Sequence, residues 1–454
     1  MPTPTLLWLR QDLRLADQSA LLAAASEGAV IPVYVLDDDG PGDWRMGGAQ
    51  RWWLHHSLAS LADDLEKCGS RLILRSGPAE AVLRRLIEET GARRIHAIRH
   101  YEPWWRKAEA ALEDVLCLHD GSHLVPIEQI QNGSGEPYRV YSAFWRKLQQ
   151  HLPPGAPAPA PENIPAPKRW PKSESLASWA LLPHKPDWAK GFSAEWTPGE
   201  AQALARAEEW ADDVHDYAEM RDLPGEEGTS LLSAHLHFGE ISPRTLYQQV
   251  HRRAHADKFL KELAWRDFSA GVITALPDYA RRNGRAKYDK LGWRSGAAAK
   301  SDLRAWQQGM TGYPIVDAGM RQLWHTGWMH NRVRMICASF LVKHLLIDWR
   351  AGERWFWDCL VDADYGNNSV NWQWVAGTGV DANMFGRIMA PLTQSEKFDA
   401  GDYIRRWVPE LADLPDSAIH DPEAAEALPK DYPAKIIGHR EGRERALAAG
   451  RKLD

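Results

Sequence analysis

The sequence predicts two dissimilar domains, an α/β domain with a doubly wound parallel sheet followed by a large all-α domain. Strand-like and helix-like segments alternate from residue 5 to residue 128, which is typical of a parallel sheet covered by helices. A stretch rich in Pro and Ala follows at 151–171, and beyond residue 200 the apolar residues recur at helical spacing. We therefore expect an α/β domain at 1–130, an interdomain linker at 131–200 and a helical domain at 201–454.

Five strands and three helices account for the first domain. The strands are expected at 5–10, 29–37, 71–76, 94–100 and 123–128, and the helices at 52–69, 78–92 and 104–118. The arrangement is Rossmann-like, but no GxGxxG motif follows the first strand. The domain is then either a scaffold without a ligand or a site where a ring-shaped ligand stacks on indoles at helix starts. These indoles, which taken alone are more typical of packing, are Trp52, Trp53, Trp104 and Trp105.

Composition excludes several classes of protein. Charged residues make up 26% of the chain and hydrophobic residues 44%, and no apolar run approaches the ~18 residues of a membrane span. The N-terminus lacks a basic region followed by an apolar core, so we expect a cytoplasmic protein. The four cysteines have neither CxxC nor Cys/His spacing, which argues against disulfides and against a metal site.

One basic run stands out in a chain whose net charge is −6. Eight Lys and Arg residues lie between Arg281 and Arg304, interleaved with Tyr288 and Trp293. Such a run is either a solvated surface or a patch that follows phosphates, and the aromatic residues favour the second interpretation.

The helical domain offers a candidate anion site early in its sequence. Gly228, Thr229 and Ser230 place a flexible turn and two hydroxyls before a helix, which suits a phosphate or diphosphate and also an ordinary N-cap. A later helix carries a carboxylate, an indole and a guanidinium on one face at i, i+3 and i+4: Glu262, Trp265 and Arg266.

The densest signal lies at 324–374, where Trp residues alternate with Asn, Arg and Asp. A helix is expected to start there near Asn368 or Ser369, either of which can cap it. In that helix Trp372 and Trp374 point about 200° apart, so that one faces inward and the other faces an opening.

Conventional hydrolytic and nucleotide-hydrolysing motifs are absent. The chain contains no GxSxG elbow, no HExxH and no Walker loop. The aromatic rings, the candidate anion site and the carboxylates Asp362 and Asp364 fit a bound planar cofactor better, because such a cofactor carries the difficult chemistry itself.

Several rare strings also carry a resemblance to a known family. TGYPIVDAGMRQL, TGWMHNRVRM, LLIDWR, DADYGNN and NWQW occur in the order typical of DNA photolyases and cryptochromes. The similarity extends over nearly the whole chain, including WLRQDLRLADQSAL and EGTSLLSAHLHFGEISPR. The chain most resembles bacterial cyclobutane pyrimidine dimer photolyases of class I or class III.

The resemblance implies a site for FAD. A first group of residues would hold the ribityl and diphosphate part: Tyr217, Thr229, Ser230, Leu231, Leu232 and Ser233. Asp362 and Asp364 would contact the flavin and adenosine side, with Arg334 paired to Asp362. Asn368 would face flavin N5, a position that is typically an acid in plant cryptochromes, so Asn368 favours a repair enzyme.

The resemblance also implies an electron path and a second chromophore. Trp372, Trp349 and Trp293 match the row of indoles that carries electrons between the flavin and the surface, with Trp293 as the outer member. A light-harvesting methenyltetrahydrofolate or 8-hydroxy-5-deazaflavin would bind the first domain near its four helix-start indoles.

The remaining matches concern damaged DNA, single- or double-stranded. The pocket for a flipped pyrimidine dimer would comprise Glu262, Trp265, Asn331, Arg332, Met335 and Trp374. Contacts near DNA would come from Arg221, Arg266, Arg387 and Gln394. Glu262 would either stay protonated or hydrogen-bond to a thymine carbonyl.

The function implied is light-driven repair of DNA by a monomeric deoxyribodipyrimidine photolyase. An electron would pass from photoexcited, reduced FAD to the dimer, open its ring and return. A cryptochrome-like blue-light signalling flavoprotein and a (6-4) photolyase are the alternatives, and Asn368, Met335 and the WQW string favour dimer repair over both.

Overall fold

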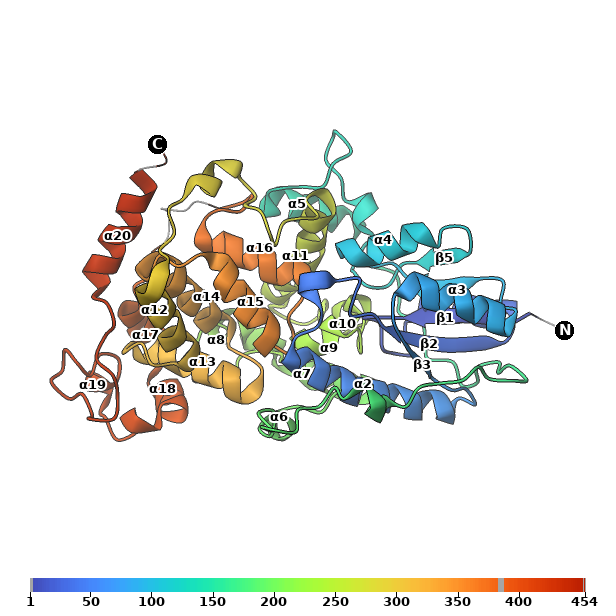
Figure 1. The fold of residues 1–454 in the computed structure, drawn as a ribbon, viewed down its shortest axis with the longest axis horizontal. Helices are drawn as coiled ribbons and strands as arrows, with labels where there is room; N and C mark the ends of the chain where they lie inside the picture. Colours follow the sequence, from blue (N-terminus) through green and yellow to red (C-terminus); the bar gives the residue numbers. More distant parts are fainter. Residues whose placement is uncertain (1–2, 383–387, 452, 454) are drawn as a thin grey trace.

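A five-stranded parallel sheet forms the first domain of a computed structural model, which describes residues 3–382, 388–451 and 453 (Figure 1). The strands are Thr5–Leu9 (β1), Val30–Leu36 (β2), Ile73–Ser76 (β3), Ile95–Ile98 (β4) and Leu116–His119 (β5). Their order is β3-β2-β1-β4-β5, and every neighbouring pair is parallel. The strand order reverses between β1 and β4, so the predicted doubly wound sheet is confirmed.

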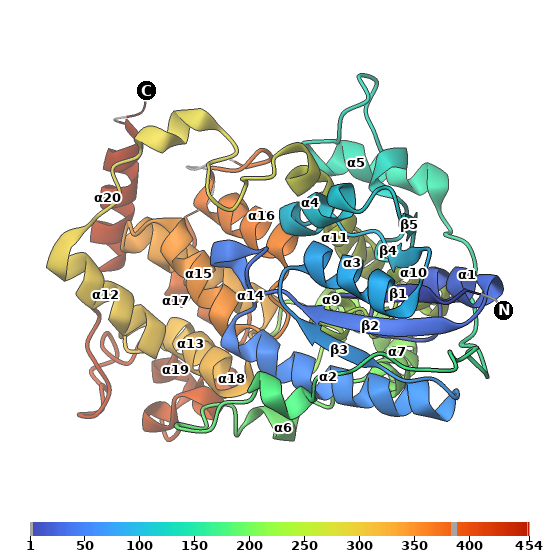
Figure 2. The ribbon, with the colours of Figure 1, turned by 45° about the vertical axis from the view of Figure 1, so that its right-hand side comes forward.

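Helices cover both faces of the sheet (Figure 2). They are Ser19–Glu27 (α1), Gly48–Lys67 (α2), Ala79–Thr90 (α3) and Pro103–Ala111 (α4). Apolar side chains of α1 and α2 pack with Leu7 and Leu9 on one face, while those of α3 and α4 pack with Leu6 and Trp8 on the other. All seven residues of β2 are buried, as expected for a strand covered on both sides.

The last strand differs from the prediction. It is Leu116–His119, inside a segment that was expected to be helical, and α4 ends at Ala111. Residues 123–128 are not a strand; the N–H groups of Leu124 and Val125 donate instead to the carboxylate of Asp267, at 3.0 and 3.3 Å. A buried side chain from the second domain therefore replaces the expected strand partner, which the local pattern of apolar residues does not reveal.

The second domain is helical, as predicted (Figure 1). Its longer helices are Glu200–Asp213 (α7), Pro243–Val250 (α10), Asp257–Ala275 (α11), Gly296–Gln308 (α12), Pro314–Thr326 (α13), Asn331–Ser339 (α14), Trp349–Cys359 (α15), Tyr365–Ala376 (α16) and His439–Arg451 (α20). Two short helices, Tyr217–Met220 (α8) and Ser233–His237 (α9), contribute to the site described below. Shorter helices are Phe192–Glu195 (α6), Pro391–Lys397 (α17), Gly401–Trp407 (α18) and Asp416–Ile419 (α19). No helix among the described residues is long and apolar enough to cross a membrane.

The segment between the domains is partly helical. Residues Tyr141–Leu148 form α5, whose Phe144 and Leu148 belong to the core of the helical domain. The Pro-rich stretch at 151–171 is irregular, as predicted, and it follows the first domain through backbone hydrogen bonds from Asp17 to Ala158 and from Val30 to Pro165. The predicted boundaries at 130 and 200 remain predictions.

Helix α16 begins earlier than expected. Asp364, and not Asn368 or Ser369, caps the helix by accepting from the N–H of Asn367 at 2.6 Å. A carboxylate at this position also complements the positive end of the helix dipole. The same residue was expected to contact a cofactor, so one carboxylate both starts the helix and faces the site.

Candidate cofactor and substrate cavity

A cavity of about 590 Å³ opens among helices α8, α9, α11, α14, α15 and α16. Its volume is within the range of pockets that enclose a ligand of cofactor size. It brings together most residues predicted for the cofactor and the lesion. Those that line it are Tyr217, Ser230, Ser233, Glu262, Trp265, Arg266, Asn331, Arg332, Arg334, Met335, Asp362, Asp364, Asn368, Trp372 and Trp374, with Arg221.

An ion pair forms one wall of this cavity. Arg334 donates from Nη1 and Nη2 to the two oxygens of Asp362, at 3.1 and 2.8 Å, so the predicted pairing is present. A further bond from Arg334 Nε to Met329 O fixes the guanidinium. Only 4% of the Asp362 side chain is exposed, and an unpaired carboxylate at that depth would cost several kcal/mol.

The candidate anion site is a strained turn followed by a short helix. Leu231 has φ 51°, a left-handed conformation that is uncommon for a residue with a side chain. No side chain caps α9, which leaves the amides of its first turn available to an anion. Of residues 229–233 only Ser230 and Ser233 reach the cavity, whereas Leu232 is fully buried in the core. With five residues, α9 contributes little dipole.

Two unpartnered polar atoms test whether an anionic cofactor fits. Arg266 Nη1 and His237 Nδ1 are buried without a hydrogen-bond partner among the described residues, and both side chains line the cavity. A diphosphate or ribityl group would satisfy such atoms, which are costly to leave unpaired. Burial lowers the pKa of His237 to about 4, so its imidazole is neutral at pH 7. These residues fit a dinucleotide with a planar ring.

Asn368 is oriented by its neighbour helix. Its Nδ2 donates to Glu353 O of α15 at 3.1 Å, which leaves the amide oxygen to face the cavity. A neutral amide there can accept a hydrogen bond from a ring N–H, as the resemblance implies for the N5 position of a flavin.

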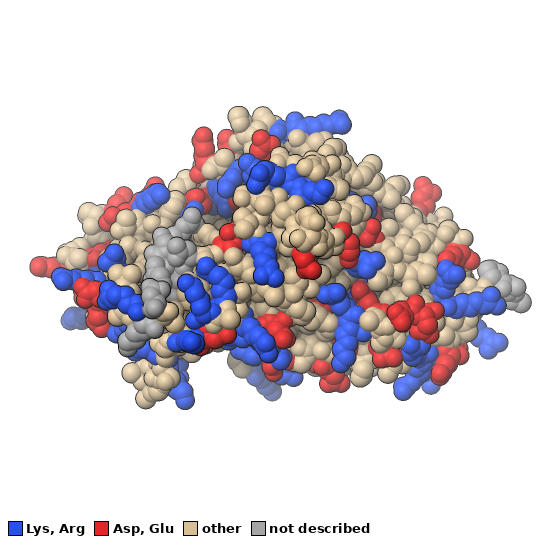
Figure 3. Space-filling model, turned by 90° about the horizontal axis from the view of Figure 1, so that it is seen from above, with Lys and Arg blue, Asp and Glu red and all other residues tan. Residues whose placement is uncertain are grey.

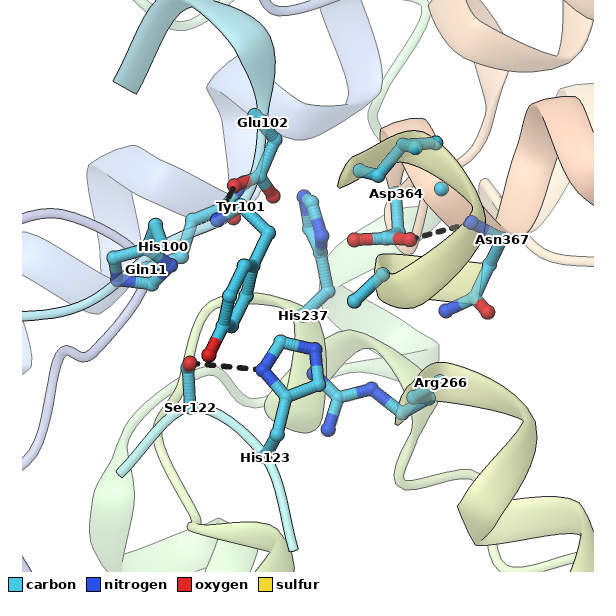
Figure 4. Close-up of a pocket in the computed structure, with 13 residues that line it drawn as sticks. Gln11, His100, Tyr101, Glu102, Ser122, His123, His237, Arg266, Asp364 and Asn367 are labelled. Atoms are coloured by element: carbon cyan, nitrogen blue, oxygen red, sulfur yellow. Dashed lines mark hydrogen bonds between the residues drawn. The ribbon is translucent and has the colours of Figure 1, made fainter. Parts of the chain in front are cut away.

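A small polar chamber adjoins the cavity between the two domains (Figure 4). Its volume is about 20 Å³, enough for about one water molecule. Figure 4 shows side chains of both domains facing one another across it: Gln11, His100, Tyr101, Glu102, Ser122 and His123 from the first, His237, Arg266, Asp364 and Asn367 from the second. Burial raises the pKa of Glu102 and lowers that of His123, which reduces the charge enclosed here.

Arg266 points into the molecule. The resemblance placed it near DNA, but its Nη2 donates to Leu236 O at 3.0 Å and its side chain lines both the cavity and the interdomain chamber. Helical spacing correctly put Arg266 on one face with Glu262 and Trp265, yet that face borders the interior. This position favours a role for Arg266 inside the cavity over a contact with a DNA phosphate.

Trp265, which lines the cavity, stacks on a residue that sequence reasoning missed. Tyr141 of α5 stacks on Trp265 with ring centroids 3.9 Å apart and an angle of 5° between the planes. The N–H of Tyr141 donates to Asp381 at 3.0 Å, which helps to hold its ring. Tyr141 lay in the expected linker, so its aromatic character carried no signal for a site.

Glu262 lies beside two basic side chains at the cavity wall. Its Oε1 lies 2.6 Å from Arg221 Nη1 and 3.1 Å from Lys258 Nζ. Both alternatives for Glu262, a protonated carboxyl or a hydrogen bond to a thymine carbonyl, stay predictions. The carboxylate remains able to accept a hydrogen bond from a base.

Of the two other residues predicted near DNA, only Gln394 lies in the described part of the chain. It is half-exposed on α17 and does not line the cavity. Arg387 lies outside the described residues.

The inner indoles of the predicted electron path lie on neighbouring helices. Trp372 lines the cavity, and Trp349 starts α15, where its Nε1 donates to Asn283 at 2.9 Å. Gly352 is one turn after Trp349, and a Cβ at this glycine would lie 2.2 Å from the Trp372 ring. The close approach of α15 and α16 thus depends on the missing side chain of Gly352. It lets the helix that carries Trp349 lie directly against the helix that carries Trp372.

The outer end of the path is a loop before α12. Trp293 is half-buried there, and the N–H of Arg294 donates to Leu346 O at 2.8 Å, which brings the loop beside the start of α15. A further indole, Trp306, was missed by sequence reasoning; its ring lies 6.3 Å from that of Trp372 and is fully buried. Trp306 is therefore a competing neighbour for Trp372.

The four helix-start indoles of the first domain act as packing residues. Trp53 lies 6.1 Å from the nearly parallel ring of Phe238 and bonds Glu240 through its Nε1. The other three contact protein rings: Trp52 touches Phe192, Trp104 touches Tyr365 and Trp105 touches Trp8. None of them lines the cavity or the interdomain chamber. Their placement supports the scaffold interpretation at these four positions.

Three of the eight basic residues in the run at 281–304 have polar partners in the protein. Arg281 contacts Asp43, Arg294 contacts Asp302, and Arg285 donates to Gly377 O. Figure 3 shows one face of the molecule, on which Lys and Arg are interspersed with Asp and Glu. The other five, Arg282, Lys287, Lys290, Lys300 and Arg304, are exposed, so a patch that follows phosphates stays a prediction.

A parallel α/β domain beside a helical domain, with a cavity suited to a ring-bearing dinucleotide, defines a flavin-binding class of protein. A family profile described as the FAD binding domain of DNA photolyase matches residues 259–452, and one described as DNA photolyase matches residues 5–165. The chain belongs to the DNA photolyase and cryptochrome family. No group of three His, Cys, Asp or Glu in the part of the chain that the structure describes is arranged for a metal ion.

Individual relatives agree with this assignment. The chain is 49% identical to the deoxyribodipyrimidine photo-lyase of Agrobacterium fabrum, over 98% of this chain and 97% of that protein. A bacterial class III photolyase from Agrobacterium tumefaciens superimposes with a TM-score of 0.94 at 48% identity, over 100% of this chain and 98% of that one. Cryptochrome-1 of Arabidopsis thaliana is 33% identical over 97% of this chain and 69% of its own length.

Proposed function

We propose that this protein repairs cyclobutane pyrimidine dimers in DNA with light, using FAD bound in the cavity. The single observation that carries the proposal is that one cavity holds both residue sets, the ion pair, amide and hydroxyls for the cofactor and the indoles for a lesion. When bound, FAD supplies light absorption and electron transfer to the dimer.

The residues of the chain bind and orient the two partners. Trp265 and Trp374 at the cavity wall would stack on a dimer flipped out of the helix, which offsets the energy of extruding it. Asn331 and Met335, one turn apart on α14, would contact the same bases. Asn368 would hold the flavin edge, and the path from Trp372 through Trp349 would bring electrons inward.

The proposal extends to the surroundings of the site. We propose that the protein is a monomer that acts in the cytoplasm on single- or double-stranded DNA. A second chromophore, methenyltetrahydrofolate or 8-hydroxy-5-deazaflavin, remains part of the proposal, and the ring contacts of the four indoles within the protein favour a place for it elsewhere in the first domain.

A lesion assay tests the function directly. Reduced protein is mixed with an oligonucleotide that holds either one cyclobutane thymine dimer or one (6-4) lesion, in darkness and under blue light. We expect light-dependent loss of the cyclobutane lesion only, with dark binding that weakens steeply with salt. If neither lesion were lost, a signalling role would be favoured. If only the (6-4) lesion were lost, the protein would be a photolyase with the (6-4) lesion as its substrate.

Asp364 provides a test of the cofactor site. Asp364→Ala is expected to weaken FAD binding roughly tenfold, or about 1.4 kcal/mol, and to lower the Tm because the cap of α16 is lost. Asp364→Asn retains a capping side chain and is the matched control, with a nearly normal Tm and weaker FAD binding. Flavin absorbance and titration of the apoprotein measure the affinity, and thermal unfolding measures the Tm. Normal FAD affinity in the two variants would show that Asp364 does not contribute to FAD binding.

A further inference from the structure

Five side chains of alternating charge form a continuous row at the cavity. Lys258 Nζ lies 3.1 Å from Glu262, which lies 2.6 Å from Arg221. Arg221 Nε is 3.6 Å from Asp222, and the other oxygen of Asp222 accepts from Arg332 Nη2 at 2.6 Å. The row joins α11, the turn after α8 and the first turn of α14 through side chains alone.

Asp222 is the member of the row that does not line the cavity. Lys258, Glu262, Arg221 and Arg332 all line it, whereas Asp222 lies behind the two arginines with 30% of its side chain exposed. No predicted contact to cofactor or lesion explains its position. A carboxylate beside the cations of a DNA-binding site opposes the binding of phosphate.

Arg332 retains capacity for another anion. Arg332 Nε is buried without a hydrogen-bond partner among the described residues, and its Nη1 reaches only Met335 Sδ, at 4.0 Å. The Arg332 guanidinium also lies 4.5 Å from the centre of the Phe398 ring, which holds its plane in place. A phosphate at the rim would compete with Asp222 for a cation that is already oriented.

We propose that Asp222 is a release residue, which competes with DNA phosphates for Arg221 and Arg332. This inference rests on the proposed function, because it requires DNA at the cavity. Phosphate contacts are the same for damaged and repaired strands, so they hold the product as firmly as the substrate. While the dimer fills the cavity, its base contacts add to the phosphate contacts. Once the bases leave the cavity, Asp222 forms its ion pairs with the two arginines again and the strand dissociates.

The test compares Asp222→Asn with wild type in full-length protein loaded with FAD. We expect undamaged oligonucleotide to bind about threefold to tenfold more tightly, the size expected when one or two partly exposed ion pairs stop competing. The slope of log affinity against log salt should steepen by about 0.7 to 0.9 for each additional phosphate that the arginines neutralise. Repair in a single turnover should be unchanged, whereas the steady-state kcat should fall because product release slows.

Asp216→Asn is the matched control. Asp216 lies six residues before Asp222 in the same segment, and the ion pair it makes is with His215, at 3.3 Å, so its removal changes the net charge equally without touching the row. Asp222→Glu should retain wild-type behaviour if competition is the role. Weaker binding of both DNAs by Asp222→Asn would show that Asp222 merely positions the arginines, and unchanged binding would also overturn the proposal. If wild type itself repairs no lesion, the proposed function fails, while affinity for undamaged DNA is still measured separately.

Discussion

Trp349→Phe should prevent light from reducing oxidised FAD at a useful rate, while chemically reduced protein should still repair dimers. A phenyl ring is much harder to oxidise than an indole, so the step from Trp372 outward loses its donor. Even a barrier increase of about 1.4 kcal/mol slows a step tenfold, and we expect a loss of at least about that size. Flavin absorbance under continuous blue light with an external reductant measures the rate.

The control for this variant is Trp306→Phe. Trp306 contacts Trp372, with centroids 6.3 Å apart, and like Trp349 it is fully buried. The two substitutions therefore remove the same atoms from the core and carry similar stability costs. The proposed path runs from Trp372 through Trp349 to Trp293 and does not include Trp306, so photoreduction should persist in Trp306→Phe. A wild-type photoreduction rate in Trp349→Phe would mean that electrons take another route. If photoreduction were lost in Trp306→Phe alone, that route would run through Trp306.

The fold was predictable wherever a regular pattern reflected packing on one or two faces. β2 is apolar throughout because both of its sides are covered, and α16 separates buried Trp372 from half-exposed Trp374 as the helical period requires. The strand β5 was missed because a four-residue strand beside a helix leaves too short a pattern, and its identity depends on pairing with β4. Nonlocal pairing of this kind leaves no trace in a short window of sequence.

The candidate site shows the same limit. The Arg334–Asp362 pair follows from the resemblance together with the cost of an unpaired carboxylate, and it is present. The contact of Glu262 with Arg221 and the inward direction of Arg266 depend on which groups face them across the cavity. Tyr141 was discounted because the segment around it looked like a linker. Residue type alone could not supply these contacts, since each partner lies in a different element of the chain.

Trp374→Ala is expected to weaken the binding of dimer-containing DNA by about 1 to 3 kcal/mol, the magnitude of base stacking on an aromatic ring. The indole is half-exposed and lines the cavity with Trp265, so its removal takes away one stacking surface for the flipped bases. Binding of undamaged DNA should change little, because phosphate contacts dominate there. FAD content should also be retained, because Trp372, on the opposite side of α16, is the buried indole of this helix.

Fluorescence anisotropy in darkness measures the effect, with dimer-containing and undamaged oligonucleotides of the same sequence. Trp324→Ala is the control, since Trp324 is 51% exposed and does not line the cavity, so an indole is lost from the surface without altering the proposed lesion pocket. A loss of affinity for the damaged strand alone, seen only in Trp374→Ala, would place the flipped dimer against this ring. An equal loss of affinity for both oligonucleotides would mean that Trp374 contacts the DNA backbone or supports the fold. The lesion would then have to stack on Trp265 alone.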